Sequence, residues 1–258
     1  MWQLADKACA SRILLGTAQY PSLEILQQAI RAAKTSVITV SLKRENPYKK
    51  AGSAFWEMCQ ETDCYILPNT AGCKTAREAI QIAQMARDIF NTSWIKLEVV
   101  FDEELLVPHS FELVKAAEKL IGMGFEVFPF CTDDLLLCKN LVEVGCRILM
   151  PWGAPIGSGK GLLDPYQLKI LRLRFPEITL IVDAGLGSPL HAMQAMLLGY
   201  DAILINSAVA KALSPIKMAK AFHLAVRSGR LAYQAGVIPE SDFAVASTPL
   251  TQTFYGSI

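Results

Sequence analysis

One rhythm runs through the whole chain: short aliphatic or β-branched segments alternate with longer amphipathic segments. The short segments predict strands, and they are Ile13–Gly16, Val37–Leu42, Tyr65–Leu67, Trp94–Val99, Glu126–Phe130, Arg147–Met150, Thr179–Val182 and Ala202–Ile205. The longer segments space their apolar residues as helices do, and they are Leu23–Lys34, Thr75–Phe90, Ser110–Ile121, Asp134–Val144, Pro165–Phe175, Ser188–Leu198 and Pro215–Ser228. A strand followed by a helix, repeated about eight times over about 250 residues, is typical of a (β/α)8 TIM-type barrel. A doubly wound parallel sheet shows the same alternation and is the main alternative.

Residues at the helix boundaries support this division. Caps or N1 prolines are predicted at Thr75, Ser110, Asp164–Pro165 and Ser214–Pro215. Glycines predict helix ends at Gly145, Gly199 and Gly229. No linker rich in Pro, Gly or Ser divides the chain, so we predict one α/β barrel domain over residues 1–258.

The charge balance argues against polyanionic partners. The chain has 25 Lys and Arg against 24 Asp and Glu, a net charge of +1, whereas nucleic-acid and membrane-surface binders carry a basic excess on one face. No apolar run approaches the ~20 residues of a membrane helix, and the N-terminus does not resemble a signal peptide. Seven cysteines with no CxxC pair suggest neither a disulfide framework nor a zinc site. We expect a soluble, cytoplasmic protein that binds neither nucleic acid nor membrane.

The segment Trp94–Val99 carries the strongest indication of chemistry. Strand side chains alternate between faces, so Lys96 and Glu98 share the face opposite Ile95 and Leu97. In a barrel the aliphatic face packs under the helices, which sends Lys96 and Glu98 into the interior. Desolvation there is expected to lower the pKa of Lys96 and make it an amine nucleophile toward a carbonyl. An interior salt bridge without function is the alternative.

Asp183 follows the predicted strand Thr179–Val182 directly. It therefore belongs to the carboxyl-terminal rim, where barrel enzymes place their active sites. A helix cap near this position is the alternative role. With Lys96 and Glu98, Asp183 completes a predicted catalytic set.

Three turns after late strands can approach an anion closely. They are residues 153–161, residues 184–187 and residues 206–208. Glycine lets backbone N–H groups reach a phosphate, and barrels commonly bind phosphate after strands seven and eight. Neither a P-loop nor a GxGxxG signature fits residues 153–161, so a phosphorylated small molecule is favoured over a dinucleotide.

These segments together resemble the thiazole synthases, the barrel enzymes that build the thiazole phosphate moiety of thiamine. The resemblance rests on motifs in order along nearly the whole chain: residues 15–17, 67–73, 94–99, 150–151, 155–159, 182–185, 206–208 and 229–230. It implies a transferase that condenses 1-deoxy-D-xylulose 5-phosphate, dehydroglycine and sulfur from the C-terminal thiocarboxylate of a small sulfur-carrier protein. It also implies a cytoplasmic homotetramer that needs no metal or organic cofactor and depends on a source of dehydroglycine.

The resemblance assigns roles residue by residue. The lysine matching Lys96 forms an imine, or Schiff base, with the sugar ketone, and carboxylates matching Glu98 and Asp183 move protons. The positions that match the substrate-binding residues of the family are Gly157, Ala184, Gly185, Asn206 and Ser207.

The sequence also departs from the family pattern. The departures include Gln19, His109 and Trp152, which leaves sugar and carrier specificity open. A sulfur-inserting thiosugar synthase and a class I aldolase acting on a phosphosugar are the alternative enzymes, because both use the same imine. A degenerate barrel that only binds a phosphosugar or a carrier protein is the non-enzymatic alternative.

Overall fold

A computed structural model of the protein describes residues 1–42, 50–102 and 104–247, without the side chains of residues 50–53. Eight parallel strands close into a barrel and follow one another around it in sequence order, with β10 pairing β3 to complete the circle. The barrel strands are β3 (Ile13–Gly16), β4 (Val37–Ser41), β5 (Tyr65–Asn69), β6 (Trp94–Leu97), β7 (Glu126–Cys131), β8 (Ile148–Pro151), β9 (Thr179–Asp183) and β10 (Ala202–Ile205). Closure confirms the (β/α)8 barrel and excludes the open doubly wound sheet.

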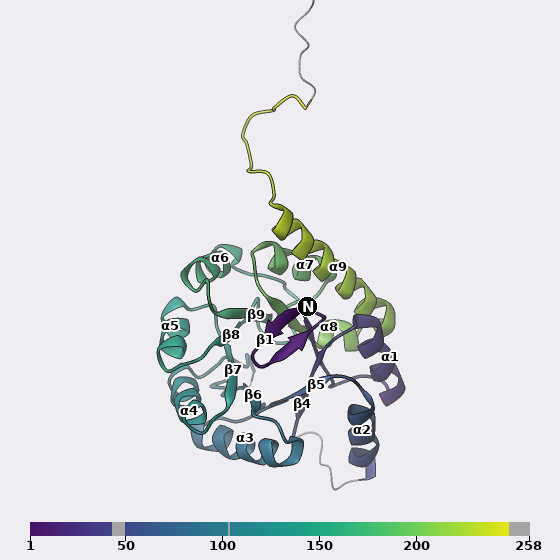
Figure 1. The fold of residues 1–258 in the computed structure, drawn as a ribbon, viewed down its shortest axis with the longest axis vertical. Helices are drawn as coiled ribbons and strands as arrows, with labels where there is room; N and C mark the ends of the chain where they lie inside the picture. The colour runs from purple at the N-terminus through teal and green to yellow at the C-terminus, as the bar shows by residue number, and fades with distance from the viewer. Residues whose placement is uncertain (43–49, 103, 248–258) are drawn as a thin grey trace, which may run out of the picture.

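The helices form a ring outside the barrel (Figure 1). They are α1 (Leu23–Ala33), α2 (Lys50–Glu61), α3 (Ala76–Phe90), α4 (Ser110–Gly122), α5 (Leu135–Glu143), α6 (Pro165–Arg174), α7 (Pro189–Leu197), α8 (Ser207–Ala210) and α9 (Pro215–Ala235). All seven predicted helices are present, whereas α2 and the short α8 were not predicted. Phe55, Met58 and Cys59 of α2 are buried at helical spacing, a signal that the sequence does contain.

Several predicted boundaries hold and two need correction. The side chains of Thr75 and Asp164 accept the backbone N–H groups of Glu78 and Gln167 and so cap α3 and α6. Helix α4 starts at Ser110, but its cap is His109, which makes no side-chain capping bond.

Gly229 does not end its helix, because α9 continues to Ala235. Gly229 instead lies where α9 crosses α7: a Cβ there would stand 2.7 Å from the carbonyl oxygen of Met193. The missing side chain therefore serves helix packing, while Gly145 and Gly199 follow α5 and α7 with φ of 104° and 87° as predicted.

The two faces of each strand serve different cores, as predicted for β6. Outward residues such as Ile95, Leu97 and Val99 pack under the helices. Inward residues such as Trp94 and Phe128 fill the barrel interior. The faces thus separate aliphatic packing from the interior that holds Lys96.

A hairpin that was not predicted covers the amino-terminal mouth of the barrel (Figure 1). Its strands are β1 (Trp2–Leu4) and β2 (Lys7–Cys9), and Leu4 and Cys9 join the interior cluster. Asp6 in its turn accepts a hydrogen bond from the indole N–H of Trp94 at 2.8 Å. The hairpin therefore closes the barrel interior from this side, and among the described residues the interior opens at its carboxyl-terminal mouth. Within the described ranges, no helix has the length and apolar character to cross a membrane.

Candidate active site

Lys96, Glu98 and Asp183 meet inside the carboxyl-terminal end of the barrel. The Lys96 Nζ lies 2.7 Å from Glu98 Oε1 and 2.8 Å from Asp183 Oδ2. The three residues are 6%, 8% and 3% exposed, respectively. Asp183 ends β9 and does not act as a helix cap, because the cap of the following helix α7 is Ser188. The ammonium group of Lys96 therefore lies between two carboxylates, and all three groups are shielded from water.

This arrangement corrects the expected effect on the lysine. Burial lowers the pKa of Lys96, but the charges and hydrogen bonds of Asp183 and Glu98 outweigh it, so the pKa is raised above its ordinary value. Burial raises the pKa of Asp183, and the neighbouring Lys96 partly offsets that rise. The resting site thus holds a charged lysine, and Asp183 is a carboxylate with an increased affinity for a proton.

Neighbouring residues hold this group in place. The Thr70 hydroxyl donates to the Glu98 carbonyl oxygen and accepts from the Glu98 backbone N–H, each at 2.8 Å. These bonds hold Glu98 immediately beyond the end of β6. The ring of Phe130 lies 5.4 Å from Lys96 Nζ and supports the cation with its π face.

The three ionisable residues line a cavity of about 610 Å³. The same cavity is lined by every predicted substrate-binding residue: Gly157, Ala184, Gly185, Asn206 and Ser207. They come from the segments that follow β8, β9 and β10, as the sequence indicated, and Ser207 is the first residue of α8. The size suits a small phosphorylated molecule.

Close backbone packing shapes the two glycine loops. A Cβ on Gly187 would overlap the carbonyl oxygen of Gly159, so the loops after β8 and β9 touch through their main chains. Gly161 N–H donates to the Gly185 carbonyl at 2.8 Å, and Gly187 N–H donates to His191 Nδ1 at 3.1 Å. Ala184 has φ of 78°, a conformation that is costly for alanine and that often accompanies functional sites.

Several polar groups remain available at this rim. The N–H groups of Gly157, Gly159 and Gly185 donate to no described acceptor. Asn206 Oδ1 is buried and has no hydrogen-bond donor among the described residues. Such groups are suited to a polar ligand, because buried polar atoms normally have partners.

Five further polar residues of the cavity were not predicted as site residues: Thr17, Thr39, Ser41, Asn69 and Lys211. Thr39 and Ser41 share an inward face with Val37, and Val37 packs in the barrel interior. A polar residue at an interior position near the end of a strand is the sequence signal by which Thr39 and Ser41 could have been predicted. Lys211 follows α8 and adds a cation one helical turn after Ser207, a spacing that the sequence shows once the short helix α8 is known.

The three named departures from the family pattern lie outside the described lining of this cavity. Trp152 donates its indole N–H to Asp133 at 3.0 Å and ties the loops after β7 and β8 together. His109 caps α4 and packs edge-on against Phe101. Gln19 adopts φ of 69° in the turn after β3.

Known proteins are similar to this chain over nearly its whole length. The sequence model described as thiazole biosynthesis protein ThiG matches residues 3–249. The chain is 56% identical over 248 residues to the thiazole synthase of Nitrobacter winogradskyi, covering 96% of this chain and 95% of that one. It is 57% identical over 240 residues to the thiazole synthase of Brucella anthropi, covering 93% and 94%.

A solved structure is similar over the same extent. It is the BexX/CysO complex of Amycolatopsis orientalis, with a TM-score of 0.82, 30% identity, and coverage of 93% of this chain and 97% of that one. The match of nearly the whole sequence, with more than half of the residues identical to named thiazole synthases, shows the family. The chain belongs to the family of the thiazole biosynthesis protein ThiG, the thiazole synthases.

Proposed function

We propose that this thiazole synthase works through an imine between Lys96 and the ketone of 1-deoxy-D-xylulose 5-phosphate. The observation that carries the proposal is the contact of Lys96 Nζ with both Glu98 and Asp183 in one buried cavity. A primary amine adds to a ketone, and loss of water leaves the imine. The imine makes the adjacent carbon acidic. A carboxylate that contacts the lysine nitrogen, as those of Glu98 and Asp183 do, is then close enough to act as a base.

The charged resting state requires a first proton transfer. Lys96 must release a proton before its lone pair can attack the ketone. Asp183 is the preferred acceptor, because its pKa is raised and its Oδ2 lies 2.8 Å from Nζ. The protonated carboxyl group can then return the proton to the oxygen that leaves as water. Glu98, held by Thr70, remains available for later proton transfers.

We assign the substrate phosphate to the rim formed by the glycine loops. Gly157, Ala184 and Gly185 offer backbone groups there, while Asn206 and Ser207 offer polar side chains. Lys211 contributes a cation to the same wall and favours an anionic group. The sugar ketone would then extend toward Lys96, as imine formation requires.

The other inputs follow from the family resemblance. Sulfur would arrive on the thiocarboxylate of a small carrier protein, and the similarity to BexX in its complex with CysO supports a protein partner. Dehydroglycine would come from a separate enzyme. We also propose that the protein is a cytoplasmic homotetramer, which sedimentation of the purified protein and localisation in cells would test.

Borohydride trapping tests the imine directly. Reduction in the presence of the pentulose phosphate should add one reduced sugar phosphate to wild-type protein, and peptide mapping should place it on Lys96. Lys96→Met should form no adduct, whereas Lys169→Met, on the exposed side of α6, should react like wild type. An adduct on another residue, or none, would contradict the mechanism.

A reconstituted reaction tests the overall activity. Thiazole phosphate should form only when the thiocarboxylated carrier and dehydroglycine accompany the sugar. Carbon–carbon cleavage without the carrier would instead identify an aldolase. A sulfur-containing sugar formed without dehydroglycine would identify a thiosugar synthase.

A further inference from the structure

A second cavity, of about 390 Å³, lies at the opposite end of the barrel. Its wall includes residues 10–12 just before β3, Lys34 after α1, and residues of α9 from His223 to Leu231. The active-site cavity begins beyond the other end of β3, at Gly16. The two cavities are therefore separated by the length of a barrel strand.

The side chains that line this second cavity are strongly basic. Arg12, Lys34, Arg227 and Arg230 surround it together with His223, and no described residue of its lining is acidic. Lys34, Arg227 and Arg230 form no ion pair with any described carboxylate. The Nε of Arg230 is buried and has no described acceptor. The chain has a net charge of only +1, yet three cationic side chains without a described ion-pair partner line this one cavity.

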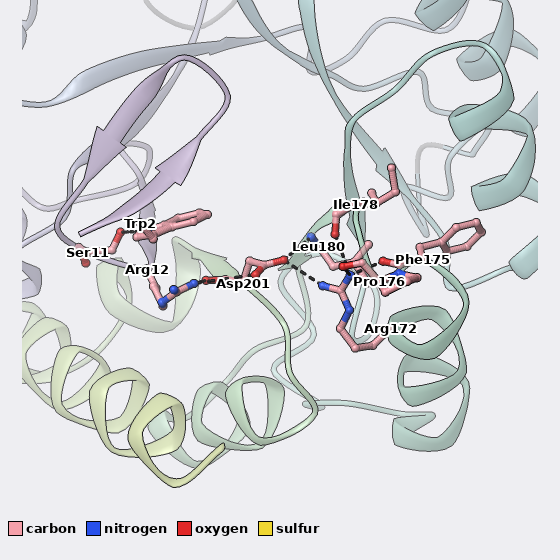
Figure 2. Close-up of polar contacts among 9 residues, drawn as sticks. All are labelled: Trp2, Ser11, Arg12, Arg172, Phe175, Pro176, Ile178, Leu180 and Asp201. Atoms are coloured by element: carbon pink, nitrogen blue, oxygen red, sulfur yellow. Dashed lines mark hydrogen bonds and ion pairs between the residues drawn. The ribbon is translucent and has the colours of Figure 1, made fainter. Parts of the chain in front are cut away.

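The carboxylate beside Arg12, that of Asp201, is shared with a second arginine (Figure 2). Arg12 donates to the Asp201 carbonyl at 2.6 Å and stands 4.0 Å from its Oδ1, while its guanidinium covers the ring of Trp2. On the other side, Arg172 reaches Asp201 Oδ2 at 3.0 Å. One carboxylate therefore serves two arginines, and it also accepts the backbone N–H of Leu180 at 3.0 Å.

Burial and the surrounding cations together lower the pKa of two groups at this cavity. Burial and the neighbouring charge of Arg230 lower the pKa of Arg12, which Asp201 only partly offsets. Burial and the charges of Lys34 and Arg227 lower the pKa of His223, which a backbone hydrogen bond partly offsets. A bound anion would relieve this repulsion, because it adds negative charge where several positive groups already converge.

We propose that this amino-terminal basic cavity binds a small polyvalent oxyanion, a phosphate ester or a diphosphate. Guanidinium groups such as those of Arg12 and Arg230 match phosphate oxygens in pairs. Val226 and Leu231 supply apolar wall for a carbon skeleton. The volume of about 390 Å³ fits a metabolite, whereas a nucleic acid or a membrane would need a broad basic surface. The inference is independent of the imine chemistry at Lys96.

Calorimetric titration with inorganic pyrophosphate tests the proposal. Lys34→Gln/Arg227→Gln changes two exposed side chains of the cavity, so folding should be preserved. Removing these charges should weaken binding by about tenfold or more, and high salt should weaken wild-type binding. The matched control Lys169→Gln/Arg174→Gln removes one lysine and one arginine from the exposed surface of α6 and should bind like wild type.

Two accompanying measurements separate this site from the active site and from a subunit contact. Borohydride trapping should be unchanged in both double variants, because neither alters the Lys96 cavity. Equal affinity of the two double variants would overturn the proposal, as would loss of pyrophosphate binding only on Lys211→Gln in the active-site cavity. Dissociation of the assembly specifically in Lys34→Gln/Arg227→Gln would also overturn it, since the cavity would then be a contact between copies.

Discussion

Lys96 Nζ lies 2.8 Å from Asp183 Oδ2, although their strands, β6 and β9, are not neighbours in the barrel. The contact is made across the barrel interior, where water is scarce and the attraction between opposite charges is strong. It keeps the lysine charged at rest. Imine formation in this cavity is therefore coupled to a proton transfer within the charged group, and the first two predictions follow from that coupling.

Lys96→Met should destabilise the protein at neutral pH by about 3–5 kcal/mol, because it leaves buried carboxylates without their cation. The pKa of Asp183, already raised by burial, should rise further. A carboxyl group with a raised native pKa weakens the fold when it is ionised, so the deficit should shrink as pH falls from about 7 to about 5. Urea unfolding at both pH values measures this. A deficit that does not change with pH, or one shared by exposed Lys169→Met, would contradict the account.

Asp183→Asn should lower the pKa of Lys96, because one of the two carboxylates that raise it is removed. The pH at which borohydride trapping is half maximal should fall by about one unit or more. Product formation should nevertheless fall by about a hundredfold or more, since a proton carrier is lost. Exposed Asp88→Asn on α3 is the control and should change neither quantity. Wild-type turnover in Asp183→Asn would remove Asp183 from the mechanism.

Gly187→Ala should weaken phosphosugar binding by about tenfold, because the added methyl group forces apart two loops that touch through their backbones. Lys96 lies on β6, away from both loops, and should still form the imine at saturating sugar. Trapping at increasing sugar concentration measures both effects. Gly122→Ala, where a Cβ meets no atom within 4 Å, should leave the concentration dependence unchanged. Equal sugar dependence in the two variants would argue against the phosphate assignment.

Gly229→Ala should destabilise the barrel despite the higher helix propensity of alanine. The new Cβ would stand 2.7 Å from the Met193 carbonyl oxygen and 2.9 Å from Met196 Cβ. Overpacking costs about 1–3 kcal/mol, which exceeds the gain of about 1 kcal/mol in helix propensity. Ser228→Ala, at the exposed neighbouring position, should be neutral or slightly stabilising in the same urea titration. A more stable Gly229→Ala would show that the helix crossing adjusts freely.

The alternation of short aliphatic segments with amphipathic segments predicted the barrel strands to within about two residues at either end, because parallel strands buried on both faces are continuous apolar segments. It missed the hairpin of β1 and β2, whose strands of three residues are too short to establish a period. It also predicted a helix end at Gly229, where the absence of a side chain instead lets α9 pack closely against α7. Local signals therefore located elements but did not describe contacts between them.

The sequence by itself determined which face of β6 carries Lys96 and Glu98, and that Asp183 and the glycine loops stand at strand ends. Both properties can be predicted from a single segment: alternation along a strand separates its two faces, and the end of the apolar segment marks the strand end. Only the tertiary structure decided the charge of Lys96, because the pKa depends on the distance to Asp183 across the barrel. It alone also gathered Arg12, Lys34 and Arg227 around one cavity. Electrostatic interactions depend on separation in space, and separation along the chain does not reveal it.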